Sequence, residues 1–304
     1  MSQLLCDLLE AQGIDCRADA PMAAYTTLRV GGAAECLAEP HSTESAALAM
    51  YAAQAVSAPV TVIGRGSNLL VRTGGIKGLV LCIGRAMSGI EIEGTQMRVG
   101  AGATLHEAAR AAWRAGLSGL EALEGIPGTV GGAACMNAGA YGAEMAQVVQ
   151  SVEALDVKGY PRMFDSAALA YGYRQSALQN GLWVITKVTL NLTPGDPEAI
   201  AEAMAEYHRR RWEKQPLDLP SAGSFFKRPP GQFAGTLIEA AGLKGFAIGG
   251  AQVSEKHAGF LVNTGGATAD DFIELMKAVQ ARVFDHSGVR LEPEVRILGC
   301  DTSY

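Results

Sequence analysis

Apolar residues recur at helical spacing in two N-terminal stretches, residues 2–12 and 43–55, and Ser42 stands at the N-cap position of the second. Short runs that predict β-strands lie between and after these helices, at residues 61–63, 79–82 and 96–99. The segment 182–192 alternates, so that one face carries Leu182, Val184, Thr186, Val188, Leu190 and Leu192. Many short strands with few helices predict an α+β domain up to about residue 193.

The segment 191–197, Asn-Leu-Thr-Pro-Gly-Asp-Pro, is rich in turn-forming residues and is the predicted boundary between two domains, 1–193 and 194–304. Helices are expected at 198–212 and 269–285, the second with Thr268 and Asp271 at capping-box spacing. Its expected core stripe consists of Phe272, Leu275, Met276, Val279 and Val283. A strand over 289–297 is expected to end the smaller C-terminal domain.

Composition narrows the possible classes of protein. A chain of 304 residues with 48% hydrophobic content suggests about two domains. The net charge of −6 argues against nucleic acid or an anionic membrane as the main partner, because both attract a basic surface. Six cysteines without CxxC or metal-ligand spacing are typical of reduced thiols in the cytosol. No Lys or Arg precedes Arg17, so we expect no signal peptide and a cytoplasmic location.

Two glycine-dense segments, 62–70 and 125–142, offer the first sign of chemistry. Glycines allow backbone N–H groups to surround phosphate oxygens, and Ser67, Asn68 and Thr129 add side-chain donors. Neither segment has the glycine spacing of a Rossmann fingerprint, so a dinucleotide would bind here in another way. The competing interpretation is a pair of tight turns that bind no ligand. On composition alone, the ligand-binding and ligand-free interpretations are about equally balanced.

These segments, together with Thr-Leu-Arg-Val-Gly-Gly at 27–32, resemble the FAD domain of UDP-N-acetylenolpyruvoylglucosamine reductases, and the match runs from about residue 24 to 299. The resemblance implies an α+β chain: a vanillyl-alcohol-oxidase-like (PCMH-type) FAD-binding domain, then a smaller α+β substrate-binding domain. Arg65 and Thr73 depart from the family pattern, which more often carries a small residue or Asn at the first position and Asp at the second. By resemblance, non-covalent FAD contacts are expected at Ile63, Gly64, Arg65, Gly66, Ser67, Asn68, Leu69, Pro127, Gly128, Thr129, Gly132, Ala138, Gly139 and Val184.

The resemblance also implies a reaction, the NADPH-dependent reduction of an enolpyruvyl UDP-sugar to UDP-N-acetylmuramate in peptidoglycan synthesis. Hydride addition to an enol ether spreads negative charge into the adjacent carboxylate, so the site needs cationic groups and a proton donor. The resemblance assigns Arg174, in Tyr-Gly-Tyr-Arg-Gln-Ser, to the carboxylate, which suits a planar guanidinium. Without the resemblance, an arginine beside tyrosines is more often a stacked surface residue.

The segment Ser-Ala-Gly-Ser-Phe-Phe-Lys-Arg-Pro at 221–229 carries the proton donor of the family, here Ser224. An isolated serine would be an ordinary turn residue, and acid catalysis by a hydroxyl requires a desolvated pocket. Lys214 and Lys227 resemble substrate-binding positions, the former for the diphosphate, although the run 208–214 would otherwise be a solvated helix face. Arg228 is also expected at the substrate and departs from the usual Asn.

The last motif is Leu-Glu-Pro-Glu-Val-Arg at 291–296, in which alternation puts the charged residues on one face. By resemblance Glu294, rather than Glu292, is the catalytic carboxylate and Arg296 a substrate contact; a solvated charged face is the alternative. His257 has no other His or Cys at ligand spacing, so we expect a structural role and no metal.

The short interval between Arg174 and Ser224 resembles type II reductases, which lack an additional tyrosine-bearing loop. We expect a monomer that uses FAD, NADPH and a UDP-sugar. Two alternatives stay open: an oxidase of the same flavin fold, and a catalytically silent nucleotide-sugar-binding protein. A covalent flavin would favour the first, and a protein purified without flavin the second.

Overall fold

The computed structural model describes residues 2–301, and the chain folds into two compact units. Unit 1 consists of Met1–Asp19, Glu35–Arg65 and Lys77–Arg210. Unit 2 consists of Ala20–Ala34, Gly66–Ile76 and Arg211–Tyr304. Each unit is therefore assembled from three separate segments of the sequence.

A five-stranded antiparallel sheet forms one layer of unit 1, in the order β12-β11-β13-β7-β6. Its strands are β6 (Ile90–Glu93), β7 (Gln96–Gly100), β11 (Val149–Leu155), β12 (Pro161–Asp165) and β13 (Val184–Asn191). Val184, Val188 and Leu190 on the predicted apolar face of β13 are fully buried. Ile185 and Thr189 on its other face are buried too, so this central strand is covered on both sides.

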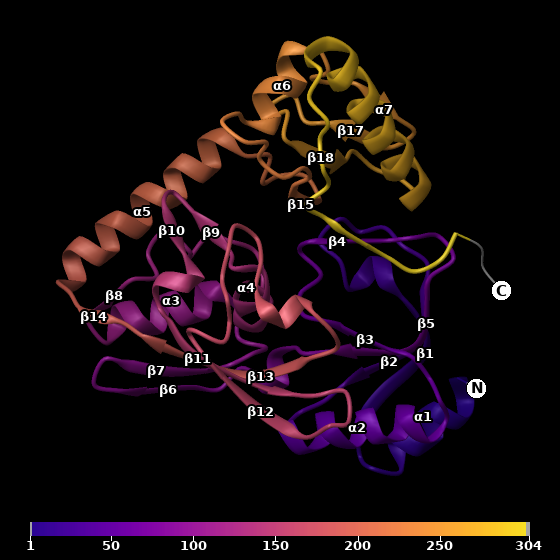
Figure 1. The fold of residues 1–304 in the computed structure, drawn as a ribbon, viewed down its shortest axis with the longest axis vertical. Coiled ribbons are helices and arrows are strands. Elements are labelled where there is room, and N and C mark those ends of the chain that lie inside the picture. The colour runs from indigo at the N-terminus through magenta and orange to yellow at the C-terminus, as the bar shows by residue number, and fades with distance from the viewer. Residues whose placement is uncertain (1, 302–304) are drawn as a thin grey trace. The chain divides into compact units, whose positions relative to one another are not determined.

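A second sheet has the order β1-β2-β5-β3. It contains β1 (Asp15–Pro21), β2 (Ala33–Glu39), β3 (Val60–Ile63) and β5 (Ile76–Cys82), and β3 runs parallel to β5. The predicted N-terminal helices are present as α1 (Ser2–Glu10) and α2 (Thr43–Ala55), which lie beside this sheet in Figure 1. Ser42 caps α2 as predicted, in a capping box with Ser45.

Short elements complete unit 1 and carry the second glycine-rich segment. They are α3 (Leu105–Arg114), β8 (Leu117–Ser118), α4 (Val130–Met136), β9 (Gly139–Ala140), β10 (Ala143–Glu144) and β14 (Thr193–Pro194). Single 3-10 turns lie at Arg85–Met87, Met145–Gln147 and Ala177–Gln179, with another in unit 2 at Met22–Ala24. Helix α5 (Pro197–Lys214) begins in unit 1, and its last residues belong to unit 2.

Unit 2 has its own sheet and hydrophobic core. The sheet order is β15-β18-β17-β16, with β15 (Ser221–Ser224), β16 (Ala247–Ile248), β17 (Ala251–Val253) and β18 (Phe260–Asn263). Helices α6 (Ala234–Ala240) and α7 (Ala269–Ser287) lie next to it (Figure 1). The capping box of α7 between Thr268 and Asp271 is confirmed, and all five predicted stripe residues are buried.

The prediction of a C-terminal strand over 289–297 is wrong for most of that range. Only β19 (Arg296–Leu298) is a strand, and it runs parallel to β4 (Leu69–Val71). Pro293 has no N–H to donate, and its neighbours bond to the segment after β15 instead. The Lys227 N–H donates to the Glu292 carbonyl at 2.8 Å, and the Glu294 N–H to the Phe225 carbonyl at 2.9 Å.

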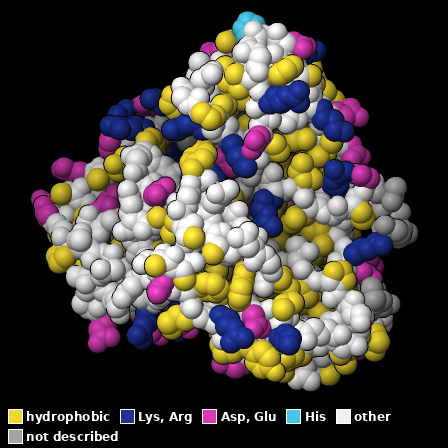
Figure 2. Space-filling view, viewed as in Figure 1, with side chains coloured by type: hydrophobic (Ala, Val, Ile, Leu, Met, Phe, Trp, Pro, Cys, Tyr) yellow, Lys and Arg dark blue, Asp and Glu magenta, His cyan; other side chains and the backbone are white. Residues whose placement is uncertain are grey.

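The compact units do not coincide with the predicted domains 1–193 and 194–304. Unit 1 extends to Arg210, and unit 2 recruits two N-terminal segments, 20–34 and 66–76. The assignment of a ligand to each domain stays a prediction. Among residues 2–301, no helix is both long and apolar enough to cross a membrane. On the face shown in Figure 2, Lys and Arg side chains lie in small groups interspersed with Asp and Glu.

Candidate active site

The first glycine-rich loop connects β3 to β4 and presents backbone N–H groups without partners. Within residues 2–301, no N–H group of residues 64–68 donates a hydrogen bond to the protein. Gly66 has φ +64°, and a Cβ there would collide with the main chain of Tyr25 and Thr26. Packing inside unit 2 therefore requires a glycine at position 66, whether or not a ligand approaches it.

The second glycine-rich segment leads into α4, whose N-cap is the buried Thr129. Thr129 Oγ1 accepts a hydrogen bond from the Gly132 N–H at 3.3 Å. A Cβ on Gly64 would collide with this same oxygen, so the two glycine-rich segments meet within unit 1 at Gly64 and Thr129. Gly132 is exposed, and a Cβ there would meet only Thr129 Oγ1, at an ordinary 3.4 Å.

These features fit the diphosphate of a dinucleotide such as FAD. A neutral surface of free N–H groups suits phosphate oxygens, and Gly132 lacks a side chain where the protein itself has room for one. The side chains of Ile63, Leu69 and Val184 are buried, so these residues offer a ligand their main chain. Of the expected FAD contacts, Gly66, Ser67, Asn68 and Leu69 belong to unit 2 and the other ten to unit 1.

Arg174 occupies the third position of a tight turn in unit 1. Gly172 and Gln175 exchange both backbone hydrogen bonds across this turn, each at 3.1 Å. Arg174 has φ +56°, where glycine or asparagine is usual and another residue pays about 1–2 kcal/mol. Its half-buried guanidinium donates to the carbonyl oxygens of Asn137 at 3.4 Å and Gly139 at 3.1 Å. Strain and anchoring of this kind are typical of a functional residue.

Ser224 is turned towards solvent by a β-bulge. Strand β15 pairs with β18 at Ser221–Val262 and at Ser224–Phe260, so β15 contains one extra residue between the two pairs. Gly223 supplies the required left-handed backbone, with φ +77°. Bulges often redirect side chains beside active sites. The result is that Ser224 is exposed while Phe225, the next residue, is fully buried.

Glu294 lies on a segment that pairs with the residue after Ser224. The Glu294 N–H donates to the Phe225 carbonyl, so Ser224 and Glu294 stand on neighbouring segments of unit 2. Asn68, expected at the FAD, donates its side-chain amide to the Glu294 carbonyl oxygen at 3.3 Å. Glu294 is half-buried, whereas Glu292 is exposed.

The predicted cationic substrate residues lie at or near the surface of unit 2. Lys227 forms an ion pair with Glu292 at 3.3 Å, and the Arg228 guanidinium lies 4.4 Å from the Phe233 ring centroid. Arg296, the first residue of β19, is exposed. Lys214 is exposed at the end of α5, and its side chain has no ion-pair or hydrogen-bond partner among residues 2–301.

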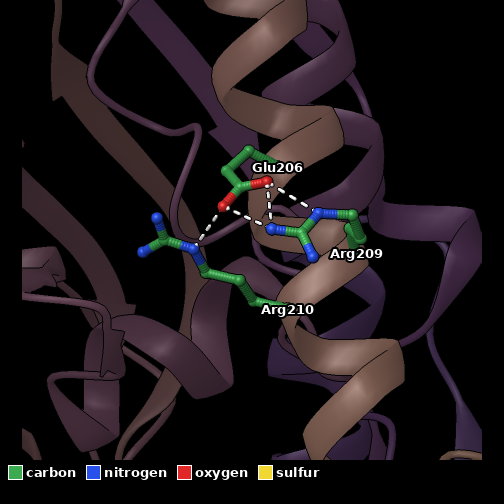
Figure 3. Close-up of polar contacts among 3 residues, drawn as sticks. All are labelled: Glu206, Arg209 and Arg210. Carbon is green, nitrogen blue, oxygen red and sulfur yellow. Dashed lines mark hydrogen bonds and ion pairs between the residues drawn. The ribbon is translucent and has the colours of Figure 1, made fainter.

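The basic run around Lys214 is partly neutralised within its own helix. Glu206 accepts hydrogen bonds from Arg209 at 2.9 Å and from Arg210 at 2.6 Å, as Figure 3 shows. Both hydrogen bonds lower the pKa of Glu206, and the bond from Arg210 has the larger effect. Both arginines therefore behave as the solvated helix face of the alternative interpretation, whereas no acid is paired in this way with the exposed Lys214.

One departure from the family pattern has a local explanation. The Thr73 hydroxyl donates to a carboxylate oxygen of Asp270 at 2.9 Å. The aspartate usual at this position would face Asp270 with a second negative charge, which is unfavourable. Nothing in the structure explains Arg65, whose side chain is exposed.

Sequence reasoning missed three residues that position this site: Gly223, Asn137 and Gln179. The glycine of Ala-Gly-Ser was a possible signal, because an isolated glycine in a strand suggests a bulge. Asn137 and Gln179 carried no clear signal, because each bonds to a main-chain carbonyl far away in sequence, and Gln179 bonds in addition to that of Arg174. Among residues 2–301, no group of His, Cys, Asp or Glu is arranged to hold a metal ion.

Comparisons with known proteins agree with the motifs. Two family models match: "FAD binding domain" over residues 34–162, and "UDP-N-acetylenolpyruvoylglucosamine reductase, C-terminal domain" over residues 215–298. A UDP-N-acetylenolpyruvoylglucosamine reductase of Pediococcus pentosaceus is 47% identical over 92% of this chain and 93% of its own length.

Solved structures extend this agreement to the fold. A crystal structure of a UDP-N-acetylenolpyruvylglucosamine reductase from Thermus caldophilus matches this chain with a TM-score of 0.81 at 38% identity. The match covers 94% of this chain and 99% of the Thermus chain. A variant of berberine bridge enzyme has a TM-score of 0.50 at 14% identity, over 70% of this chain and 50% of its own, which is a likeness of fold alone. The predicted fold class, a PCMH-type FAD-binding domain followed by a smaller α+β domain, is confirmed. By sequence and by structure, this chain belongs to the family of UDP-N-acetylenolpyruvoylglucosamine reductases.

Proposed function

We propose that this chain reduces UDP-N-acetylenolpyruvoylglucosamine to UDP-N-acetylmuramate with NADPH and bound FAD, a step of peptidoglycan synthesis. Its family membership supports the reaction. The observation that carries the proposal is the pairing in unit 2 that sets Ser224 and Glu294 on neighbouring segments. A proton donor and a carboxylate thereby lie on two segments that are joined by backbone hydrogen bonds.

We propose that the FAD is held non-covalently by the expected contact residues. The free N–H groups of residues 64–68 would surround its diphosphate, and Gly132 would leave room beside α4. When bound, FAD supplies the transfer of hydride between NADPH and the enolpyruvyl group. Release of free flavin on acid denaturation tests the non-covalent attachment, because a covalently linked flavin stays with the protein.

Each of the three proposed catalytic residues has a task in the reaction. The Arg174 fork binds the substrate carboxylate and disperses the charge that develops there during hydride addition. The Ser224 hydroxyl delivers a proton to the carbon next to that carboxylate; it is exposed in the free protein, so the bound substrate itself must exclude water from it. Glu294, on the neighbouring segment, would act with Arg174 on the enolate that develops during hydride addition.

The exposed cations would hold the remainder of the UDP-sugar. Lys214 is proposed for the diphosphate because neighbouring acids do not engage it. Lys227, Arg228 and Arg296 are proposed as further substrate contacts. Lys227 must exchange its ion pair with Glu292 for one with the ligand, which costs little between exposed groups.

One assay tests the reaction itself. We expect the purified protein to be yellow and to oxidise NADPH rapidly only when UDP-N-acetylenolpyruvoylglucosamine is present. NADPH oxidation at the same rate without the UDP-sugar would refute the proposal. A cytoplasmic location agrees with the six free cysteines, and sedimentation equilibrium tests the expected monomer.

A further inference from the structure

Two side-chain amides anchor the strained turn that carries Arg174. Asn137 Nδ2 donates to the Gly172 carbonyl at 3.0 Å, before the strained residue. Gln179 Nε2 donates to the carbonyl of Arg174 itself, also at 3.0 Å. The main chain on both sides of the positive φ is therefore held by side chains that come from outside the turn.

Gln179 ties this turn to the end of α4. Its Nε2 also donates to the Cys135 carbonyl at 3.0 Å, so both protons of the amide are used on main-chain oxygens. The same stretch of chain supplies Asn137 and Gly139, whose carbonyls accept the Arg174 guanidinium. The Arg174 side chain thus bonds directly to residues 137 and 139, and its carbonyl is tied to Cys135 through Gln179.

We propose that Gln179 is a positioning residue for Arg174. A residue with φ +56° is stable only while its surroundings hold it there. Releasing the Arg174 carbonyl lets the peptide relax, which redirects the Cα–Cβ bond and moves the guanidinium without removing it. The inference rests on the proposed function, in which Arg174 binds the substrate carboxylate.

Two variants remove the anchor in different ways. Gln179→Glu keeps the shape but places acceptor oxygens against two carbonyls, and Gln179→Met removes the donors without adding charge. Gln175→Glu is the matched control, because it adds the same charge to the same turn at an exposed side chain that makes no hydrogen bond within residues 2–301.

We expect both Gln179 variants to lower kcat about 10- to 100-fold, the effect of misplacing a reacting group by a small distance. Flavin content should stay that of the wild type, and Gln175→Glu should change neither quantity. A second readout needs no activity: in apoprotein, amide hydrogen exchange of a peptide spanning residues 171–180 should be faster in Gln179→Met. An unchanged kcat in both Gln179 variants would overturn the inference.

A double-mutant cycle separates the inference from the proposed function. If Gln179 acts through Arg174, then Gln179→Met should cause no further loss of kcat in an Arg174→Ala enzyme. The same fold-loss in both backgrounds would overturn the inference alone. An Arg174→Ala enzyme with wild-type kcat would instead overturn the proposed role of Arg174, and the inference with it.

Discussion

The side-chain amide of Asn68 donates a hydrogen bond to the main-chain carbonyl oxygen of Glu294 at 3.3 Å. The return contact is a backbone bond, since the Arg296 N–H donates to the Asn68 carbonyl at 3.0 Å. Within unit 2, the end of the first glycine-rich loop is therefore attached to the segment that carries the proposed catalytic carboxylate. A change in this loop can alter Glu294 without touching a cofactor.

We predict that Asn68→Ala slows substrate reduction more than it lowers flavin content. The variant keeps the backbone N–H groups of the loop but loses a hydrogen bond worth about 1 kcal/mol, which frees the main chain of Glu294. Flavin per chain and kcat should be measured together. Loss of flavin with an unchanged rate per bound flavin would show that Asn68 serves the cofactor instead.

Ser224→Ala should leave flavin reduction by NADPH intact and slow the reduction of the enolpyruvyl sugar. NADPH should still bleach the bound flavin at a near-normal rate, because no proton is delivered to the sugar in that step. Reoxidation by the enolpyruvyl sugar should fall by at least about 10²–10⁴, the usual loss of a general acid. Arg174→Ala and Glu294→Gln should show the same division in single-turnover measurements. A Ser224→Ala enzyme that reoxidises normally would refute the assigned role.

Gly132→Ala should weaken FAD binding while it stabilises the apoprotein. The added Cβ has room in the protein, and alanine is favoured over glycine within a helix by up to about 1 kcal/mol. Urea unfolding of apoprotein and flavin titration give the two values. Gly131→Ala is the contrast, because its Cβ would lie 2.8 Å from Ala101 Cβ and destabilise the fold. An unchanged FAD dissociation constant in Gly132→Ala would place the cofactor elsewhere. Gly66→Val is a poorer probe, since it collides with Tyr25.

Gly223→Ala should reduce activity beyond its effect on stability. A Cβ there meets no atom within 4 Å, so the cost is the positive φ, about 1–2 kcal/mol. Relief of that strain would straighten the bulge and turn Ser224 away. Gly242→Ala is the matched control, with φ +70° and equally open surroundings after α6. Thermal unfolding should show similar losses in both variants, and only Gly223→Ala should lower kcat. Equal kcat values would mean that the bulge does not position the serine.

His257 should make the protein less stable in mild acid. Burial lowers the pKa of His257 from its usual 6.5, and its Nδ1 accepts a hydrogen bond from the Gly259 N–H at 3.1 Å. The folded protein therefore keeps this ring neutral, whereas the unfolded chain takes up a proton as the pH falls below about 6.5. Stability contributed by His257 is complete above that pH and decreases below it, until the folded form is protonated as well.

Urea unfolding at about pH 7.5 and about pH 5.5 checks this expectation. The free energy of unfolding should fall on acidification in the wild type and fall less in His257→Gln. The same decrease in both proteins would assign the pH dependence to other groups. Lys244 and Glu239 also act on this ring, with opposite effects on its pKa.

Local features were readable from the sequence because their causes are local. The caps Ser42 and Thr268 each bond to a residue three positions on, so their side chains specify where α2 and α7 begin. The apolar stripe of α7 follows from a periodicity within one helix. The glycine-rich motifs identified the family, because the order of their residues is itself the signal.

Tertiary structure alone decided how the proposed site is held together. The strand predicted over 289–297 is mostly absent, because Pro293 and its neighbours find their backbone partners at residues 225–227. The same holds for Asn68 and Gln179, whose amides bond to the carbonyls of Glu294 and Cys135, groups that any residue would supply. Every residue type carries a main-chain carbonyl, so the sequence does not show which residue accepts such a bond. The contact is determined only when the fold brings the two segments together.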